Sequence, residues 1–250
     1  MENRTRKILA LTIVVSMLLV GCTGEPGADS DEKGADEIEQ PTNPTDNSTE
    51  VPEDEIIEIG GSEFCDDTNH IHCMLPFPSG AFLDVDETRD TGYSLSIDGE
   101  AIPDTRSSVS DNMVILDRLD GFSPSTQIFT AFDEVPNITG MATQFDIGIS
   151  TMDGHSSILL NLDTGEKVHH WIELDARAQE DEETIIFLRT IEGLDHNTPY
   201  AVGFRNLVDE QGTSIVPSDG FKALRDGNET DSDGIEGQRE PYEEVFNKLE

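Results

Sequence analysis

The segment SILLNLDTGEKVHHWIEL (residues 157–174) indicates most clearly how this chain folds. Ile158, Leu160 and Leu162 alternate with other residues, which is the period of a β-strand with one buried face. Asp163-Thr164-Gly165 has the composition of a turn, and an apolar alternation returns through Val168, Ile172 and Leu174. The segment therefore predicts a β-hairpin.

Similar short apolar runs recur between turn signals over residues 56–225. Most are rich in β-branched or aromatic residues, and their spacing is that of an all-β sandwich or barrel. No helical periodicity competes within this block, so we predict one mainly β domain. The candidate strands are Tyr93–Ile97, Gln127–Phe132, Phe145–Ile149, Ser157–Leu162, Val168–Leu174, Thr184–Leu188 and Tyr200–Phe204.

Residues 226–250 differ in composition from the β domain. The polar stretch Asp226–Glu240 comes first, and Pro241 then suits the first turn of a helix. The apolar residues that follow share one helical stripe: Tyr242, Val245, Phe246 and Leu249. We predict an acidic connector and a short helix, which either docks on the β domain or begins a further element.

The first 22 residues have the pattern of an export leader. Arg4, Arg6 and Lys7 form a positive start, and an apolar run follows over residues 8–20. Thirteen helical residues reach about 20 Å, short of the roughly 30 Å of a bilayer core, so a permanent spanning helix is not expected. The run closes with LVGC (residues 19–22), which resembles the lipobox of bacterial lipoproteins.

This resemblance implies that residues 1–21 are a lipoprotein signal peptide and that Cys22 carries the lipid. Two or more acyl chains anchor a protein stably. We therefore expect a membrane-anchored lipoprotein on the extracytoplasmic face of the cell envelope. Thr23 stands where an Asp would signal retention in the inner membrane, so an outer-membrane location is possible. The alternative is ordinary signal-peptide cleavage with an incidental Cys22.

Residues 22–55 are predicted to be a disordered acidic tether. From Thr23 to Glu55 there are twelve acidic residues against the single Lys33, four prolines and no aromatic residue. Such a segment cannot bury enough apolar surface to offset its ordering entropy. Its expected role is to hold the domain away from the membrane.

The charge of the whole chain excludes one class of partner. The formal net charge is −38, and removing the one acid and three bases of the leader leaves about −40. A field of this sign repels nucleic acid and anionic headgroups. DNA and RNA binding are therefore excluded.

Cys65 and Cys73 are the two cysteines that remain beside Cys22. In an exported chain they are expected to form a disulfide, which contributes about 2.5 kcal/mol in the chain-entropy model. The alternative is a metal site, because His70 and His72 lie in the same loop with Asp66 and Asp67. A disulfide-bonded Cys73 cannot serve as a thiolate ligand, so the bridge is favoured and no metal is assigned.

Other possible sites carry less weight. Asp231, Asp233, Gly234 and Glu240 match places in a calcium loop over residues 229–240, but Glu229 occupies the first place and no helix is expected before it. The adjacent His169 and His170 point to opposite faces of a strand and cannot share an ion. His155 and His196 lie at turns without a visible partner. Ser123 and Ser150 lack the second glycine of a nucleophile elbow, so no catalytic residue and no cofactor is assigned.

Three stretches resemble a known family. CMLPFPSGAFL (residues 73–83) is similar to the opening of the N-terminal domain of large bacterial lipase-like lipoproteins, of which the virulence-factor lipases are the nearest. DGFSPS (residues 120–125) is similar to a segment of the same proteins. Residues 194–212 resemble, more weakly, the closing strands of bacterial Ig-like modules.

The resemblance implies an Ig-like antiparallel β-sandwich, and in those proteins an α/β-hydrolase half follows. We therefore expect a non-catalytic binding or scaffolding domain, held at the membrane through Cys22, with a hydrolase or a surface ligand as partner. The alternative is that the chain is the truncated N-terminal part of a secreted lipase or esterase whose catalytic domain lies downstream.

Overall fold

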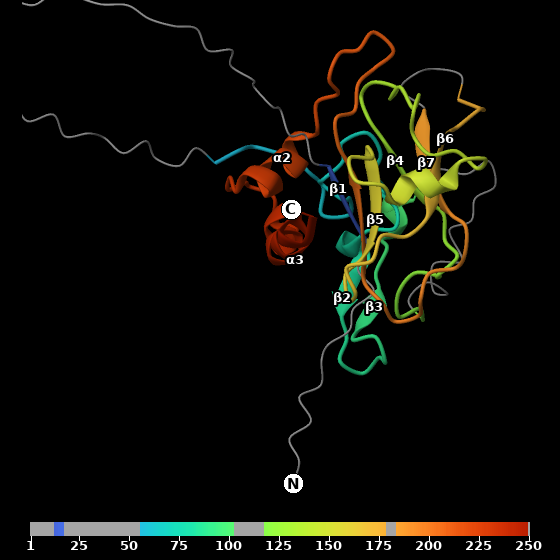
Figure 1. Ribbon diagram of the computed structural model, residues 1–250. Helices are drawn as coiled ribbons and strands as arrows, with labels where there is room; N and C mark the ends of the chain where they lie inside the picture. The colour runs from blue at the N-terminus through green and yellow to red at the C-terminus, as the bar shows by residue number, and fades with distance from the viewer. Residues whose placement is uncertain (1–12, 18–55, 103–117, 179–183, 250) are drawn as a thin grey trace, which may run out of the picture.

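The computed structural model describes residues 13–17, 56–102, 118–178 and 184–249. Most of its elements are strands in antiparallel sheets, and two helices close the chain (Figure 1). The strands are β1 (Ile13–Met17), β2 (Leu83–Val85), β3 (Tyr93–Leu95), β4 (Ile128–Ala131), β5 (Ser157–Asn161), β6 (His170–Leu174), β7 (Ile185–Thr190) and β8 (Tyr200–Phe204). The helices are α2 (Asp219–Asp226) and α3 (Asp233–Leu249), and short 3₁₀ turns are η1 (Gly80–Phe82), η2 (Gly99–Ala101) and η3 (Ile147–Thr151).

The strands form two three-stranded sheets and one two-stranded ladder. One sheet has the order β1-β8-β5 and the other β4-β7-β6, while β2 pairs with β3. All these pairs are antiparallel except β1 with β8, which is parallel. β1 comes from the apolar run of the predicted leader and covers the edge of β8 that β5 leaves open.

The two faces of the β1-β8-β5 sheet pack against different partners. On one face, Leu159 and Val202 join a core that also contains Ile172 and Ile186 of the β4-β7-β6 sheet. On the other face, Leu160 joins a second core with residues of α2 and α3. Figure 1 accordingly shows the helices on one side, β1 and β5 in the middle, and the β4-β7-β6 sheet on the far side. The alternation of strand side chains sends successive residues of β5 into these two cores.

The hairpin predicted for residues 157–174 is present only next to its turn, where Leu160 and Lys167 form an antiparallel bridge. The turn at Asp163–Gly165 is present, and Val168 N–H donates to the Leu159 carbonyl over 2.8 Å. Beyond that bond the arms diverge, because β5 pairs with β8 whereas β6 pairs with β7. The apolar faces of the two arms explain the divergence: Leu160 packs against the helices, and Ile172 packs between the sheets.

The predicted strands are otherwise confirmed, with one exception. Tyr200–Phe204 matches β8 residue for residue, and the others differ from β3–β7 by at most two residues at either end. The strand predicted at Phe145–Ile149 is wrong: Phe145 is 90 % exposed and the 3₁₀ turn η3 follows it. The apolar residues there do not face a core, and Ser150 Oγ donates to the Ile147 carbonyl over 2.7 Å to close the turn.

The helical part of the chain is larger than predicted. α2 was not predicted at all; Ser218 caps its start by accepting from Phe221 N–H, and Gly227 ends it in the left-handed conformation. α3 begins at Asp233 instead of Pro241, which lies inside the helix. Ser232 Oγ accepts from Ile235 N–H at this start, and the fully buried Ile235 extends the apolar stripe of Tyr242 and Val245.

The disulfide loop, residues 65–73, holds the two helices to the β domain. Cys65 and Cys73 are bonded across it. Ser218 Oγ at the start of α2 donates to the Thr68 carbonyl over 2.6 Å, and Ser232 Oγ at the start of α3 donates to Asp67 Oδ2. The Asp67 backbone also runs so close to Gly220 of α2 that a Cβ there would overlap the Asp67 carbonyl oxygen. The loop therefore fixes where both helices start.

Asp66 lies at the centre of this loop and is fully buried. Its carboxylate accepts from the N–H and the Oγ1 of Thr68 at 3.0 and 2.6 Å, and from Ser79 Oγ. Burial raises the pKa of Asp66 despite these hydrogen bonds. The Asp66 carboxylate is held by hydroxyl and amide donors and, in the part of the chain that the structure describes, by no cation within ion-pair distance.

Candidate functional site

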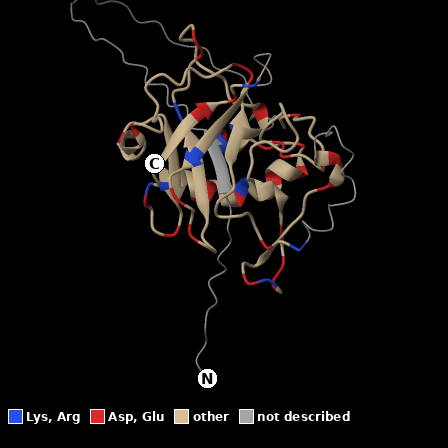
Figure 2. Ribbon diagram, turned by 90° about the vertical axis from the view of Figure 1, so that its right-hand side faces the viewer, with Lys and Arg blue, Asp and Glu red and all other residues tan. Residues whose placement is uncertain are grey.

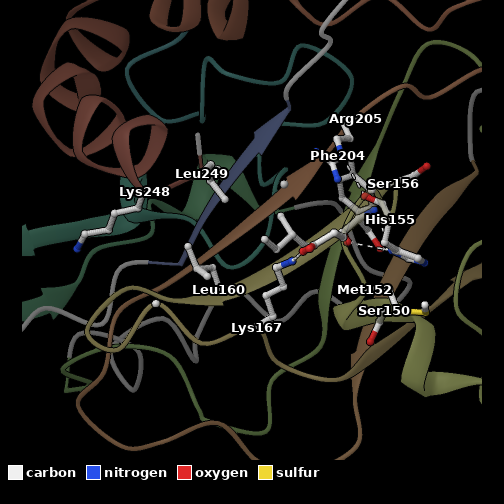
Figure 3. Close-up of a pocket in the computed structure, with 16 residues that line it drawn as sticks. Ser150, Met152, His155, Ser156, Leu160, Lys167, Phe204, Arg205, Lys248 and Leu249 are labelled. Atoms are coloured by element: carbon white, nitrogen blue, oxygen red, sulfur yellow. Dashed lines mark hydrogen bonds and ion pairs between the residues drawn. The ribbon is translucent and has the colours of Figure 1, made fainter.

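A pocket of about 380 Å³ lies where β5 and β8 meet the end of α3. Figure 3 shows it lined by residues of the η3–β5 connection, the turn after β5, the end of β8 and the last turn of α3. A volume of this size is at the small end for small-molecule sites. Glycines at three lining positions, Gly154, Gly165 and Gly203, leave its walls free of side chains there.

One wall of the pocket is apolar. The half-buried side chains of Ile158 on β5 and Leu249 at the end of α3 form it, above the buried Leu160. Met152, which is 62 % exposed, lies at its mouth. Apolar lining of this kind favours the hydrocarbon part of a ligand.

The pocket also gathers three of the chain's few cationic side chains, Lys167, Arg205 and Lys248. The whole sequence has 15 Lys and Arg against 53 Asp and Glu, so three cations around one small cavity are a local reversal of the charge of the molecule. Figure 2 shows how sparse blue residues are beside red ones along the described part of the chain. Asp153 is the one acidic residue of the lining among the described residues.

The three cations differ in how they are engaged. Lys248 Nζ donates to the Leu162 carbonyl and to Glu244 Oε1 at 2.8 and 2.7 Å, and in Figure 3 its ammonium points away from the cavity. Lys167 points toward the middle of the pocket and pairs with Asp153 Oδ1 at 2.7 Å. That hydrogen bond lowers the pKa of Asp153, whose side chain is fully exposed, so the pair is weakly held.

Arg205 is the least neutralised of the three. Its Nε donates to the His155 carbonyl over 3.0 Å, which fixes the partly buried guanidinium at the pocket. No carboxylate among the described residues lies within ion-pair distance of it, although its charge helps to lower the pKa of Asp153. Its terminal nitrogens therefore remain as donors for a ligand.

His155 lines the pocket but is occupied by its own chain. Its Nε2 lies 3.0 Å from Ala142 N–H, which can only donate, so Nε2 is the unprotonated acceptor. Nδ1 then carries the hydrogen and donates to the Ser157 carbonyl, 3.0 Å away. With both nitrogens engaged, His155 positions the strand start and is not free to act as a base.

A hydrogen-bonded serine and histidine lie behind this wall, between the two sheets. Ser157 Oγ is 2.8 Å from His170 Nε2, and His170 Nδ1 is 2.8 Å from the Val168 carbonyl. Because that carbonyl can only accept, Nδ1 carries the hydrogen and Ser157 donates to Nε2. Burial lowers the pKa of His170 to about 4. Ser157 is 2 % exposed and His170 is not exposed at all, so the pair is closed to solvent, although Ser157 is among the residues that line the pocket.

The calcium loop considered for residues 229–240 is wrong. Residues from Asp233 onward, including Glu240, form α3, and Glu236 pairs with Arg239 within the helix. This pairing lowers the pKa of Glu236 to about 2. Asp231 accepts from Ile59 N–H over 2.9 Å and so ties the segment to the N-terminal side of the domain.

The histidine candidates are also placed apart. His70 Nε2 lies 2.9 Å from Asp133 Oδ1, and His72 lies in a separate apolar hollow with Phe77 and Phe129. His169 is exposed and His170 buried, which confirms that they face opposite ways, and His196 is exposed. Over the described ranges no group of three His, Cys, Asp or Glu side chains is arranged to hold a metal ion.

The serine candidates serve local structure. Ser123 Oγ accepts from Ser125 N–H in a turn, and Ser150 Oγ accepts from His170 N–H. Cys65 and Cys73 are paired, as described above. Cys22 lies outside the described residues. So do the rest of the tether to residue 55 and all of the leader except β1.

Lys167 and Arg205 were not among the residues predicted from the sequence. Lys167 stands between Glu166 and Val168 after β5, and Arg205 stands between Phe204 and Asn206 directly after β8, so their approach depends on the β5–β8 pairing. Their one signal in the sequence is rarity, because basic residues are few in so acidic a chain.

None of the helices in the described part of the chain is both long and apolar enough to span a bilayer. No family model, no curated protein and no solved structure matches the chain. The pocket has therefore to be interpreted from its own chemistry.

Proposed function

We propose that this protein is a lipid-anchored lipoprotein of the cell envelope whose β domain binds a ligand and has no catalytic role. The observation that carries the binding part is the pocket between β5, β8 and α3. It combines an apolar wall with Arg205, whose terminal donors face no carboxylate of the described chain. Its histidine has both ring nitrogens engaged, and the Ser157–His170 pair is sealed from solvent. This arrangement favours binding over chemistry.

The anchoring part rests on the sequence. The LVGC motif places a lipid-bearing Cys22 ahead of an acidic tether, and the tether would carry the domain clear of a negatively charged surface. Cleavage before Cys22 would also remove β1 and leave β8 paired with β5 alone. The mature protein would then present the β8 edge next to the pocket.

We further propose that the domain is an Ig-like β-sandwich similar to the N-terminal domain of lipase-like lipoproteins. Two observations support this. Residues of both three-stranded sheets share one core. The two motifs that carry the resemblance also meet there, since the rings of Phe77 and Phe122 pack edge to face at 5.3 Å.

Fractionation of cells that express the full chain tests the anchor. We expect Cys22→Ser to move the protein from the membrane fraction to the soluble fraction, because the thioether lipid cannot form. Thr23→Ser is the matched control and should stay in the membrane fraction. An unchanged distribution of Cys22→Ser would refute the lipid anchor.

Hydrolysis of p-nitrophenyl esters tests the absence of catalysis. We expect the purified full chain to hydrolyse them no faster than buffer, since Ser157 and His170 are closed to solvent. Activity that disappears in Ser157→Ala would show that the pair becomes accessible and that the domain is an esterase.

A further inference from the structure

We infer that the pocket recognises an amphiphilic organic anion, a carboxylate joined to a short apolar tail. This inference rests on the proposed binding function and names the ligand class for the same site. It follows from which groups of the pocket are free, which are already satisfied, and how the two kinds are arranged.

Arg205 and Lys167 are the residues that bind the anionic end of the ligand. Arg205 is fixed through Nε, so its two terminal nitrogens keep the forked geometry that suits a carboxylate. Lys167 lies on the same cavity with its ammonium directed inward (Figure 3). Both line the same cavity, and both help to lower the pKa of Asp153.

Asp153 shows how such a carboxylate would enter. Its carboxylate already pairs with Lys167 Nζ at 2.7 Å, although the Asp153 side chain is wholly exposed. An exposed pair of this kind is held weakly and exchanges readily with another anion. Asp153 therefore competes with the ligand for Lys167, and it leaves Arg205 open.

The apolar wall of the pocket is the part that contacts the tail of the ligand. The half-buried Ile158 and Leu249, with the exposed Met152, offer hydrocarbon surface and no charge. A bare inorganic anion would leave this wall in contact with water, whereas a tail would cover it. The long-range field of the acidic chain repels every anion, so selective binding has to come from these short-range contacts.

Isothermal titration calorimetry with three probes tests the inference. The full chain carrying Cys22→Ser is used without detergent, so that no detergent occupies the apolar wall. We expect sodium octanoate to bind at one site per chain, and 1-octanol and inorganic phosphate to bind at least tenfold more weakly. Equal affinity for octanol would show that the cations do not take part. Equal affinity for phosphate would show that the wall does not, and no binding of octanoate would overturn the inference.

Charge variants locate the site. Arg205→Gln and Lys167→Met should each weaken octanoate binding about tenfold or more, because each removes a charged donor to the carboxylate. Lys222→Gln is the matched control, since Lys222 pairs with Asp219 on α2 and removing it changes the net charge by the same amount. Asp153→Asn should tighten binding. If Lys222→Gln weakens binding as much as Arg205→Gln, the effect is one of overall charge and the assigned site is wrong.

The two proposals can fail separately. Loss of octanoate binding with a membrane-bound wild-type protein would reject the ligand class and keep the anchor. A soluble wild-type protein that binds octanoate would reject the anchor and keep the pocket.

Discussion

The disulfide loop and the pocket differ in whether their charged side chains are satisfied by partners from the chain itself. In the loop, the carboxylate of Asp66 is fully buried and every donor around it comes from the same chain. In the pocket, Arg205 is partly exposed and its terminal donors face no carboxylate of the described chain. Polar groups that are satisfied internally stabilise a fold, whereas groups left with free donors at a cavity are available to a ligand. The comparison separates a structural centre from a functional one within the same domain.

The largest expected effect is at Asp66. Asp66→Ala leaves the buried donors of Thr68 and Ser79 without an acceptor, and we expect a loss of about 3 kcal/mol in the free energy of unfolding. Asp66→Asn keeps the shape and an acceptor oxygen, so it should cost less than half as much. Urea denaturation measures both. Equal losses for the two variants would contradict the role given to the hydrogen bonds.

The second effect is a pH dependence that comes from His170. Its pKa is about 4 in the folded protein, held low by burial, against about 6.5 when exposed. Between these values the unfolded chain binds a proton that the folded chain does not, so stability is complete above pH 6.5 and falls as the pH drops. We expect a loss of about 1.5 kcal/mol between pH 6.5 and 5, measured by urea denaturation at each pH.

His170→Gln provides the control for this effect. Gln keeps a hydrogen-bonding side chain opposite Ser157 but does not titrate, so the variant should be less stable at pH 7 and nearly flat between pH 6.5 and 5. A slope in the variant equal to that of the wild type would assign the pH dependence to other groups, such as the many carboxylates.

The β class could be predicted from the sequence because strand periodicity is a local property. Tyr200–Phe204 contains no polar side chain that alternates with apolar ones, which is the pattern of a strand covered on both faces. The structure has a strand with the same bounds, and all its residues are buried. Pairing is not local. The turn at residues 163–165 predicted a hairpin, but the choice of partner for β5 depends on whether Leu160 reaches the helices, which no short window of sequence contains.

The helices and the pocket could not be predicted for the same reason. α3 is amphipathic before Pro241 only through Ile235, whose burial depends on the disulfide loop and on Ser232 bound to Asp67. Cys65 and Cys73 could be paired by counting cysteines, but nothing in their spacing shows that the loop between them holds two helices. Arg205 likewise becomes significant only once β8 lies beside β5.

The smallest expected effect is the change in the free energy of unfolding when a pocket cation is replaced. It tests whether the pocket differs from the disulfide loop. Lys167→Met removes an exposed ion pair and should change the free energy of unfolding by less than about 0.5 kcal/mol. Arg205→Gln also removes the bond to the His155 carbonyl and should cost about 1 kcal/mol or less. Urea denaturation measures both losses. It is done in 0.5 M NaCl because the salt screens the self-repulsion that each lost cation adds to the acidic chain, and Lys222→Gln is the control with the same change in net charge. Losses as large as that of Asp66→Ala would make these cations part of the structural framework, as Asp66 is, and free donors would then no longer distinguish the pocket from the loop.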